Sequence, residues 1–137
     1  MKLNTYLVFD GKCAEAFKLY EKVLKGKIVF SMTHGESPMA DQTPANFKDK
    51  IMHTSLQIGD AVLMGSDAPP QHFCKPQGFS VSINVTDIAE AERIYKELSD
   101  GGEVMMPLGE TFWAQRFAMF TDKYGTPWMV NCERPRP

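Results

Sequence analysis

Hydrophobic positions along the chain follow two spacings, and the order of these spacings occurs twice. Apolar residues recur every three or four positions over two segments, which predicts one helix over residues 13–24 and another over residues 88–98. Short segments that are continuously apolar, or that alternate apolar with polar residues, predict strands. These strand segments are residues 3–9, 27–33, 51–58, 61–66, 79–85, 103–106, 115–121 and 127–132. Each half of the chain is therefore expected to have the order β-α-β-β-β.

The two halves also resemble each other in residue identity. The segment AEAFKLY at residues 14–20 returns as AEAERIY at residues 89–95, an offset of 75 positions (89 − 14). Glycine follows both segments and is expected to end both helices. A repeat of about half the chain indicates two copies of one supersecondary unit. We expect one domain over residues 1–137, with a first module at about 1–67, a linker at about 68–77 and a second module at about 78–137.

Composition and charge narrow the class of protein. Of 137 residues, 43% are hydrophobic and 23% are charged, which predicts a globular domain with its own core. The net charge of −2 and the scattered basic residues do not favour a nucleic-acid partner, because binding phosphates requires clustered Lys and Arg. No apolar segment has the length of a membrane span, and Cys13, Cys74 and Cys132 have no disulfide spacing. We therefore expect a cytoplasmic protein that binds neither nucleic acid nor membrane.

Five motifs give the doubled order a family resemblance. They are Phe9-Asp10-Gly11, Asp67-Ala68-Pro69-Pro70, Gly109-Glu110-Thr111-Phe112-Trp113, Thr121-Asp122-Lys123-Tyr124-Gly125 and Trp128-Met129-Val130-Asn131. With the repeat, the whole chain resembles the PhnB-like branch of the vicinal oxygen chelate (glyoxalase, bleomycin resistance and dioxygenase) superfamily. The resemblance implies an α+β fold in which two tandem βαβββ modules form a cupped mixed sheet, with the helices outside and a ligand cavity inside. It also implies a homodimer.

Some members of this branch carry a demethylubiquinone methyltransferase name. The sequence does not support that chemistry, because it has no glycine-rich turn between a strand and a helix to hold an adenosyl cofactor. It is also too short for a doubly wound domain. We expect no cofactor.

Enzymes of the superfamily hold a divalent ion with His, Gln or Glu side chains from four strands. The resemblance assigns these positions to Thr5, Met64, Ser80 and Met129. Ser80 follows Thr5 by the same 75 positions that separate the helices (80 − 5), and Asn4 or Tyr6 replaces Thr5 if the register is shifted by one residue. Hydroxyl and thioether groups are poor ligands for magnesium, manganese, nickel or zinc. The sequence therefore predicts that the metal site of the superfamily is absent.

Strand alternation predicts which side chains line the cavity instead. Along residues 79–85 the odd positions carry apolar side chains that face the helix, so the even positions face the cavity. The candidate ligand-binding residues come from several signals: alternation gives Ser80, Ser82, Asn84 and Asn131, and the symmetry of the repeat gives Met64 and Met129. Trp113 is added from a loop of the second half, and Arg116 from one of its middle strands. Methionine side chains adapt to apolar ligands, but they also fill cores. Trp113 has an alternative role as a loop anchor or dimer contact, and Arg116 as a surface ion pair.

These patterns favour a protein that lacks the family metal, binds a small apolar or aromatic molecule in the cup and is not an enzyme. The alternative is a lyase, isomerase or thiol-transfer enzyme of the same superfamily, with a divalent metal at a displaced site or a proton transfer centred on His53. Other metal donors are His72 with Cys74 on the proline-rich linker, and His34 with Glu36 and Asp41 on a loop. For all of these, solvated or packed polar residues are the competing interpretation. A third possibility is a module whose dimer or partner surface matters more than its cavity.

Overall fold

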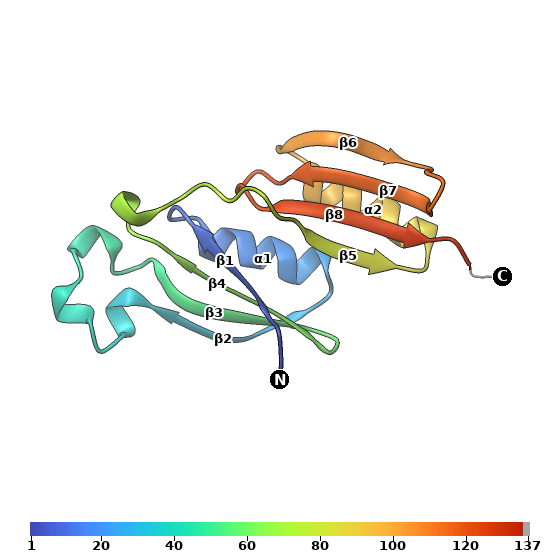
Figure 1. Ribbon diagram of the computed structural model, residues 1–137. Coiled ribbons are helices and arrows are strands. Elements are labelled where there is room, and N and C mark those ends of the chain that lie inside the picture. Colours follow the sequence, from blue (N-terminus) through green and yellow to red (C-terminus); the bar gives the residue numbers. More distant parts are fainter. Residues whose placement is uncertain (136–137) are drawn as a thin grey trace. The chain divides into compact units, whose positions relative to one another are not determined.

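The computed structural model describes residues 1–135 and has two compact units, Met1–Cys74 and a second that begins at Lys75 (Figure 1). The first unit consists of β1 (Thr5–Phe9), α1 (Cys13–Val23), β2 (Lys27–Thr33), β3 (Ile51–Ile58) and β4 (Ala61–Asp67). The second consists of β5 (Val81–Val85), α2 (Ile88–Ser99), β6 (Glu103–Gly109), β7 (Ala114–Thr121) and β8 (Pro127–Glu133). The predicted βαβββ order of each half is confirmed.

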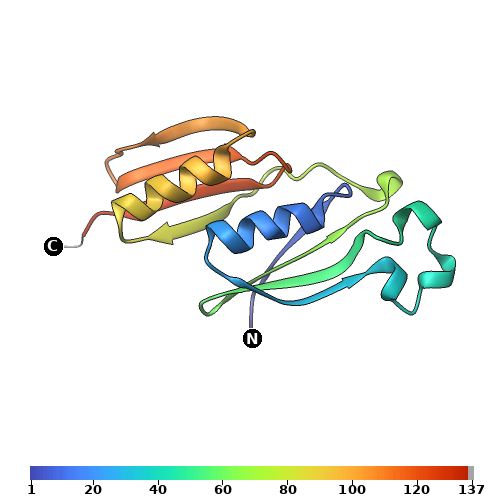
Figure 2. The ribbon, with the colours of Figure 1, turned by 180° about the vertical axis from the view of Figure 1, so that it is seen from behind.

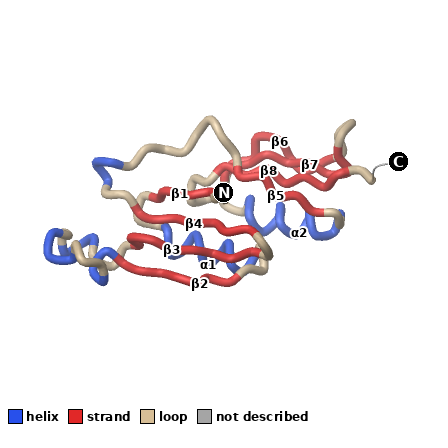
Figure 3. Tube along the Cα trace, turned by 60° about the horizontal axis from the view of Figure 1, so that its bottom comes forward, coloured by secondary structure: helices blue, strands red, loops and turns tan. Residues whose placement is uncertain are grey.

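Each unit contains one mixed four-stranded sheet, and the two sheets have the same topology (Figure 3). The strand order is β1-β4-β3-β2 in the first and β5-β8-β7-β6 in the second. The first and last strands of each module pair in parallel, and all other neighbours are antiparallel. In each unit the helix packs against one face of its own sheet (Figure 2). We call the other face of each sheet its open face.

The core of the first unit lies between α1 and its sheet. Alternation along β1 directs Leu7 and Phe9 toward the helix, and helical spacing brings Phe17 and Tyr20 to the facing side of α1. The ring centroids of these three aromatic residues are 5.6 to 6.4 Å apart, in the range of favourable aromatic pairs. Gly65 on β4 makes room for them, because a Cβ there would lie 2.6 Å from Cε1 of Phe17. Burying each of these aromatic side chains contributes about 1.5–3 kcal/mol.

The core of the second unit is built in the same way. Phe120 and Trp128 are cross-strand partners on β7 and β8, and both are fully buried under α2. Ile94 and Leu98 supply the apolar side of the helix, and the ring of Tyr95 meets Phe120 edge-on at 5.7 Å. Each unit therefore has a core between its own helix and its own sheet.

Two aspartates are buried among the described residues, one in each unit. Asp67, at the end of β4, accepts hydrogen bonds from the backbone N–H of Cys13 at 3.0 Å and of Ile51 at 2.9 Å. Cys13 begins α1, and Lys12 before it provides no side-chain cap. Asp67 therefore satisfies a helix N–H that has no partner within the helix, and it ties α1 to β3.

Asp122, the buried aspartate of the second unit, lies in the turn between β7 and β8. Its Oδ1 accepts the backbone N–H groups of Tyr124 at 2.9 Å and Thr126 at 3.0 Å, and its Oδ2 accepts the indole N–H of Trp128 at 2.8 Å. One buried carboxylate therefore shapes the turn and orients the largest side chain of the core.

The connection from each helix to the next strand passes a backbone carbonyl so closely that it requires glycine. A Cβ on Gly26 would lie 2.6 Å from the carbonyl oxygen of Gln57, and a Cβ on Gly102 would lie 2.1 Å from that of Thr121. The helices end earlier than the glycines, at Val23 and Ser99. Gly26 lies beyond the last residue of α1, but it takes part in the end of the helix, since its N–H donates to the carbonyl of Glu21 at 3.1 Å. Its missing side chain also permits the close approach to β3.

The strand boundaries differ from the prediction mainly at β6. The strand continues to Gly109 rather than ending at Met106, although it contains Pro107. It lies at the edge of the sheet, and its pairing with β7 is irregular between Met106 and Gly109, so the missing N–H of the proline breaks no regular bond. Within residues 1–135, neither helix has the length and apolar character needed to cross a membrane.

Candidate functional site

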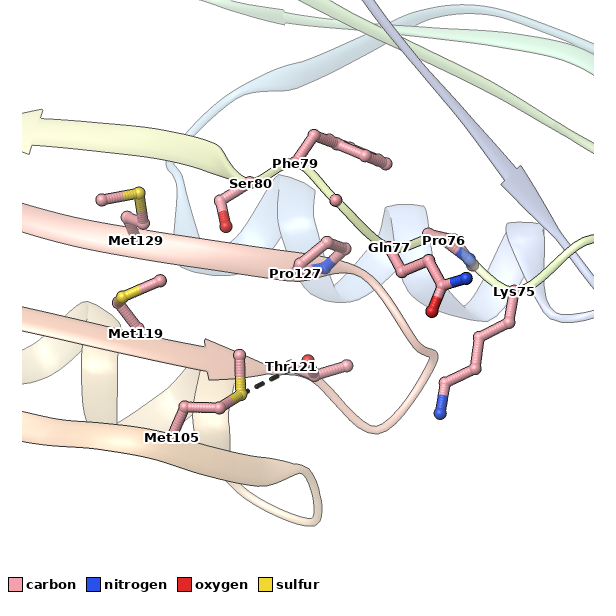
Figure 4. A pocket seen from close by; sticks show the side chains of 11 residues that line it. Lys75, Pro76, Gln77, Phe79, Ser80, Met105, Met119, Thr121, Pro127 and Met129 are labelled. Carbon is pink, nitrogen blue, oxygen red and sulfur yellow. Dashed lines mark hydrogen bonds between the residues drawn. The ribbon is translucent and has the colours of Figure 1, made fainter.

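A pocket of about 530 Å³ lies on the open face of the second sheet (Figure 4). One side is formed by the segment that leads into β5, and the floor by the ends of β6, β7 and β8. The residues that line it are Lys75, Pro76, Gln77, Gly78, Phe79, Ser80, Met105, Met119, Thr121, Pro127 and Met129. Two of the predicted ligand-binding residues, Ser80 and Met129, are therefore brought together.

Three methionines from adjacent strands form the apolar floor of the pocket. Met119 and Met129 are cross-strand partners on β7 and β8, and Met105 comes from β6. The hydroxyl of Thr121 lies 3.8 Å from the sulfur of Met105, to which it donates (Figure 4). Because thioether side chains are flexible and polarizable, such a floor can follow the shape of different apolar ligands.

Polar residues continue the open face beside Met129. The amide of Asn131 donates to Oδ1 of Asn84 at 3.2 Å, and the amide of Asn84 reaches Oγ of Ser82 at 3.5 Å, the outer limit of a hydrogen bond. Oδ1 of Asn131 is buried and has no hydrogen-bond partner in the described chain. The alternation expected along β5 thus places Ser82 and Asn84 on the same face as Met129.

Trp113 packs onto this face from the loop before β7. Its ring lies 5.2 Å from that of Phe117, which is cross-strand from Asn131, and 4.8 Å from that of Phe112. Phe117 is buried, whereas Trp113 is 45% exposed. Trp113 therefore covers Phe117 and is itself partly exposed.

The structure does not bring Arg116 to this face. Its guanidinium points to the helix side of the sheet, 3.7 Å from the carboxylate of Glu92 on α2, and it also donates to the carbonyl of Gln115. The cross-strand partner of Arg116 is Cys132, which is buried on the same side. Arg116 is thus placed to form an ion pair with Glu92, the alternative that the sequence offered to a role in ligand binding.

The first unit contains the other predicted positions. Met64 lies on the open face of the first sheet, with Tyr6 as its partner on β1 and Ser55 as its partner on β3. Thr5 has the parity of the buried Leu7 and therefore faces the helix side. Tyr6, one of the two alternatives to Thr5, is the cross-strand partner of Met64 and shares its face.

His53 also lies on the open face of the first sheet. Its Nδ1 is 3.1 Å from the hydroxyl of Tyr6, and its Nε2 is 3.3 Å from the hydroxyl of Ser55. The rings of His53 and Tyr6 are stacked at 5.6 Å with an interplanar angle of 22°, and the ring of Phe30 lies 5.8 Å from His53. Both nitrogens of the imidazole are thus held by neighbouring hydroxyls.

The four positions that the superfamily uses for a divalent ion do not fit one here. Thr5 faces the helix side, and the other three offer one hydroxyl and two thioethers, which are weak donors for hard cations. Within residues 1–135, no three or more His, Cys, Asp and Glu side chains are grouped in a way that could hold a metal. On the loop of the first unit, the backbone N–H and hydroxyl of Thr33 hold the pKa of the Glu36 carboxyl below its usual value, and His34 Nε2 lies 3.3 Å from the carbonyl of Asp67.

The thiols differ sharply in exposure, which leads to a prediction about their reactivity. Burial, and secondarily the charge of Asp67, raise the pKa of the Cys13 thiol, and Cys132 is also fully buried. Cys74 is exposed. Since the thiolate is the reactive form, iodoacetamide should modify native protein at Cys74 alone, as read by peptide mass spectrometry, and all three cysteines in denaturant. Rapid modification of Cys13 in the native protein would contradict this assignment.

Sequence reasoning missed Met105, Met119 and Thr121 in the pocket. A signal for Met119 was present: the predicted strands 115–121 and 127–132 are joined by a short connection, and counting outward from it pairs Met119 with Met129. Sequence reasoning also missed Ser55 and Phe30 beside His53. Ser55 lies two residues along β3 from His53 and so shares its face, whereas Phe30 joins through the pairing of β2 with β3, which has irregular steps.

Comparison with known proteins identifies relatives over the full length of the chain. Residues 1–131 match the family described as 3-demethylubiquinone-9 3-methyltransferase. The chain is 32% identical over 145 residues to Protein YjdN of Escherichia coli (strain K12), covering 100% of this chain and 99% of that protein. The crystal structure of protein PA1353 from Pseudomonas aeruginosa is similar with a TM-score of 0.90 and 46% identity, covering 98% of this chain and 99% of that one.

More distant structures show the same fold. The PhnB protein from Bacillus cereus has a TM-score of 0.82 at 22% identity, covering 96% of this chain and 99% of that one. A glyoxylase/bleomycin resistance protein/dioxygenase domain from Frankia has a TM-score of 0.65 at 12% identity, covering 98% of each chain. The fold is the glyoxalase/bleomycin resistance fold. By the match over residues 1–131 and the identity to YjdN, the chain belongs to the PhnB, or 3-demethylubiquinone-9 3-methyltransferase, family.

Proposed function

We propose that this protein binds a small apolar or aromatic molecule, without converting it, in the pocket on the open face of the second sheet. The observation that carries the proposal is the convergence of Met105, Met119 and Met129 on one space of about 530 Å³. Pockets for small ligands have volumes of roughly 300–1,000 Å³ and are lined mainly by apolar side chains with a few polar groups. This pocket has both features.

The distribution of side chains around the pocket suggests the chemistry of the ligand. The thioethers, Phe79 and Pro127 offer contacts to an apolar or aromatic body, and sulfur–aromatic contacts are favourable. Among the polar lining residues, Ser80 and Lys75 offer a hydroxyl and an ammonium group. The ligand we expect is a hydrophobic ring system with one hydrogen-bond acceptor or one negative charge at its edge.

Neither the family metal nor an adenosyl cofactor has a part in this proposal. The family description names a methyl transfer, but the strand-to-helix turns do not resemble a nucleotide-binding turn: residues 10–12 include one glycine, and residues 86–87 include none. The positions that correspond to the metal ligands offer thioethers and hydroxyls. A thioether floor suits binding of an apolar molecule better than Lewis-acid chemistry.

Met129→Arg tests the proposal. N-phenyl-1-naphthylamine, a neutral fluorescent probe, should bind the unaltered protein saturably, with fluorescence enhancement as the readout. The variant should bind the probe at least about 10-fold more weakly. The arginine side chain would occupy part of the pocket, and binding of the apolar probe would remove water from its charged guanidinium. Met119→Leu, which keeps the volume and the apolar character, should retain affinity within about 3-fold.

Met39→Arg is the matched control, because Met39 is 56% exposed on a loop of the first unit. It makes the same chemical change outside the pocket and should leave the affinity unchanged. Saturable binding of equal strength to the unaltered protein and to Met129→Arg would place the probe elsewhere and remove the proposal. Failure of the unaltered protein to bind the probe would count against an adaptable apolar pocket.

A further inference from the structure

The open face of the first sheet carries a short hydrogen-bonded series, Tyr6–His53–Ser55. The Tyr6 hydroxyl is 3.1 Å from Nδ1 of His53, and the Ser55 hydroxyl is 3.3 Å from Nε2. The series spans two strands that are not neighbours, since β4 lies between β1 and β3. Met64 on β4 is the cross-strand partner of both Tyr6 and Ser55, so these two side chains lie on one face of the sheet. His53 lies two residues before Ser55 on β3 and therefore shares this face.

Counting hydrogens shows that the series has a donor to spare. With a neutral imidazole, Tyr6, His53 and Ser55 each carry one polar hydrogen, which makes three. The two internal hydrogen bonds use two of them. One hydroxyl hydrogen is therefore left for an external acceptor, at Tyr6 if the imidazole is protonated on Nδ1 and at Ser55 if it is protonated on Nε2.

The surroundings of the series are aromatic and apolar. Tyr6 and Phe30 are 44% and 45% exposed, and both rings lie within 6 Å of His53. The cross-strand neighbours of the series on this face are methionines, Met64 beside Tyr6 and Met32 beside His53. A spare hydrogen-bond donor thus lies at the edge of exposed ring surface, where a bound molecule would exclude water from it and strengthen the bond.

We propose that Tyr6, Phe30, His53 and Ser55 form a second binding site, which takes a planar aromatic compound bearing a carbonyl oxygen. The ring of the ligand stacks on the exposed aromatic side chains, and its oxygen accepts the spare hydroxyl hydrogen. This site lies in the first unit and uses a directed hydrogen bond, so it does not depend on the methionine pocket of the second unit.

Three small probes separate the two parts of this recognition. Acetophenone has the ring and the carbonyl, ethylbenzene has the ring without an acceptor, and cyclohexyl methyl ketone has the acceptor without an aromatic ring. Titrations are followed by NMR on the Met129→Arg variant, so that binding at the other pocket does not interfere. Acetophenone should perturb the resonances of Tyr6, Phe30 and His53 together, and it should bind more tightly than either of the other two probes.

The imidazole of His53 reports on the hydrogen bond itself. Binding at the Tyr6 hydroxyl should shift His53 toward the Nδ1-protonated tautomer, and binding at the Ser55 hydroxyl toward the Nε2-protonated tautomer. The two tautomers are distinguished by the ring carbon and nitrogen chemical shifts. Ethylbenzene should leave the tautomer population unchanged. A His53 tautomer population that does not respond to saturating acetophenone would overturn the proposal.

Variants of the hydroxyls complete the test. Tyr6→Phe and Ser55→Ala each break one link of the series, and at least one should weaken acetophenone binding about 3- to 10-fold, the size of one net hydrogen bond, with ethylbenzene unaffected. Tyr95→Phe and Ser66→Ala are the matched controls: Tyr95 packs on Phe120 in the second unit, and Ser66 is the partner of Val8 on β1. Amide spectra confirm that each variant is folded. Unchanged acetophenone affinity in both Tyr6→Phe and Ser55→Ala would contradict the site.

Discussion

Asp122→Ala is expected to lower the free energy of unfolding by about 3–5 kcal/mol, since it leaves three donors without their acceptor and each buried unsatisfied donor costs roughly 1–3 kcal/mol. The donors are the backbone N–H groups of Tyr124 and Thr126 and the indole N–H of Trp128. Thr126 and Trp128 are buried, so water cannot replace the carboxylate without opening the core. Urea unfolding followed by tryptophan fluorescence measures the loss.

Asp100→Ala is the control, because Asp100 is an exposed aspartate that directly follows α2 in the same unit. It should change the free energy of unfolding by less than about 0.5 kcal/mol. Asp122→Asn separates shape from charge: an amide can keep one oxygen for the turn but presents an N–H₂ group to one of its donors, so we expect an intermediate loss. If Asp122→Ala were as stable as Asp100→Ala, the hydrogen bonds around Asp122 would not support the second core.

Gly102→Ala is expected to destabilise the protein by about 2–4 kcal/mol, at or above the upper part of the range for overpacked sites. The new Cβ would lie 2.1 Å from the carbonyl oxygen of Thr121 and 2.9 Å from Cα of Asp122. Both atoms belong to the backbone, so relief requires β6 and β7 to separate where their pairing begins. Thermal or urea unfolding measures the change.

Gly109→Ala provides a matched control at the other end of β6, which Gly102 directly precedes. Its Cβ would meet only the carbonyl oxygen of Pro107 at 3.9 Å, an ordinary contact, and its φ is not in the left-handed region. The added methyl should change stability by less than about 1 kcal/mol. Hydrogen exchange adds a local measurement: Gly102→Ala should accelerate exchange at the Glu103 end of β6 more than elsewhere. Equal stability of the two glycine variants would show that the strand connection adjusts freely.

The fold was predictable from the sequence because its signals are local. The periods of two and of 3.6 residues are properties of short segments, and they locate every strand and both α-helices of the two modules. The end of β6 was not predictable in this way. Pro107 is a strong signal against a strand, and only the position of β6 at the sheet edge makes the proline acceptable.

The site was harder to predict, because the face of a strand residue changes with each single-residue shift. The helices repeat at an offset of 75 positions (88 − 13), but the strands β1 and β5 repeat at 76 (81 − 5). The difference arises in the turns: residues 10–12 join β1 to α1, whereas residues 86–87 join β5 to α2. Carrying the helix offset from Ser80 into the strand selected Thr5 (80 − 75). The strand offset gives Asn4 as the counterpart of Ser80 (80 − 76) and Tyr6 as the counterpart of Ser82 (82 − 76), and both have the opposite parity to Thr5. A one-residue shift of this kind reverses every side chain of a strand.

Arg116 shows a different limit. The pairing of β7 with β8 is regular from Arg116 to Thr121, so alternation places Arg116 with Ala118 and Phe120 on the helix side of the sheet. The charge of Arg116 and its position on a middle strand suggested the cavity, but neither property fixes the face of a strand residue. The polar row Ser82–Asn84 was assigned correctly to the open face, since β5 pairs with β8 without interruption.

The junctions at Gly26 and Gly102, where the chain passes close to a backbone carbonyl, have a consequence for how the two modules should be compared. The two glycines are 76 positions apart (102 − 26), as are the residues before them, Lys25 and Gly101, which share a positive φ of 54° and 77°. The same left-handed backbone is thus formed by lysine in one module and by glycine in the other. At this junction the two modules share a backbone conformation without sharing the residue. Comparisons of one module with the other, or with half-length chains, should therefore use the torsion angles at this junction as well as residue identities.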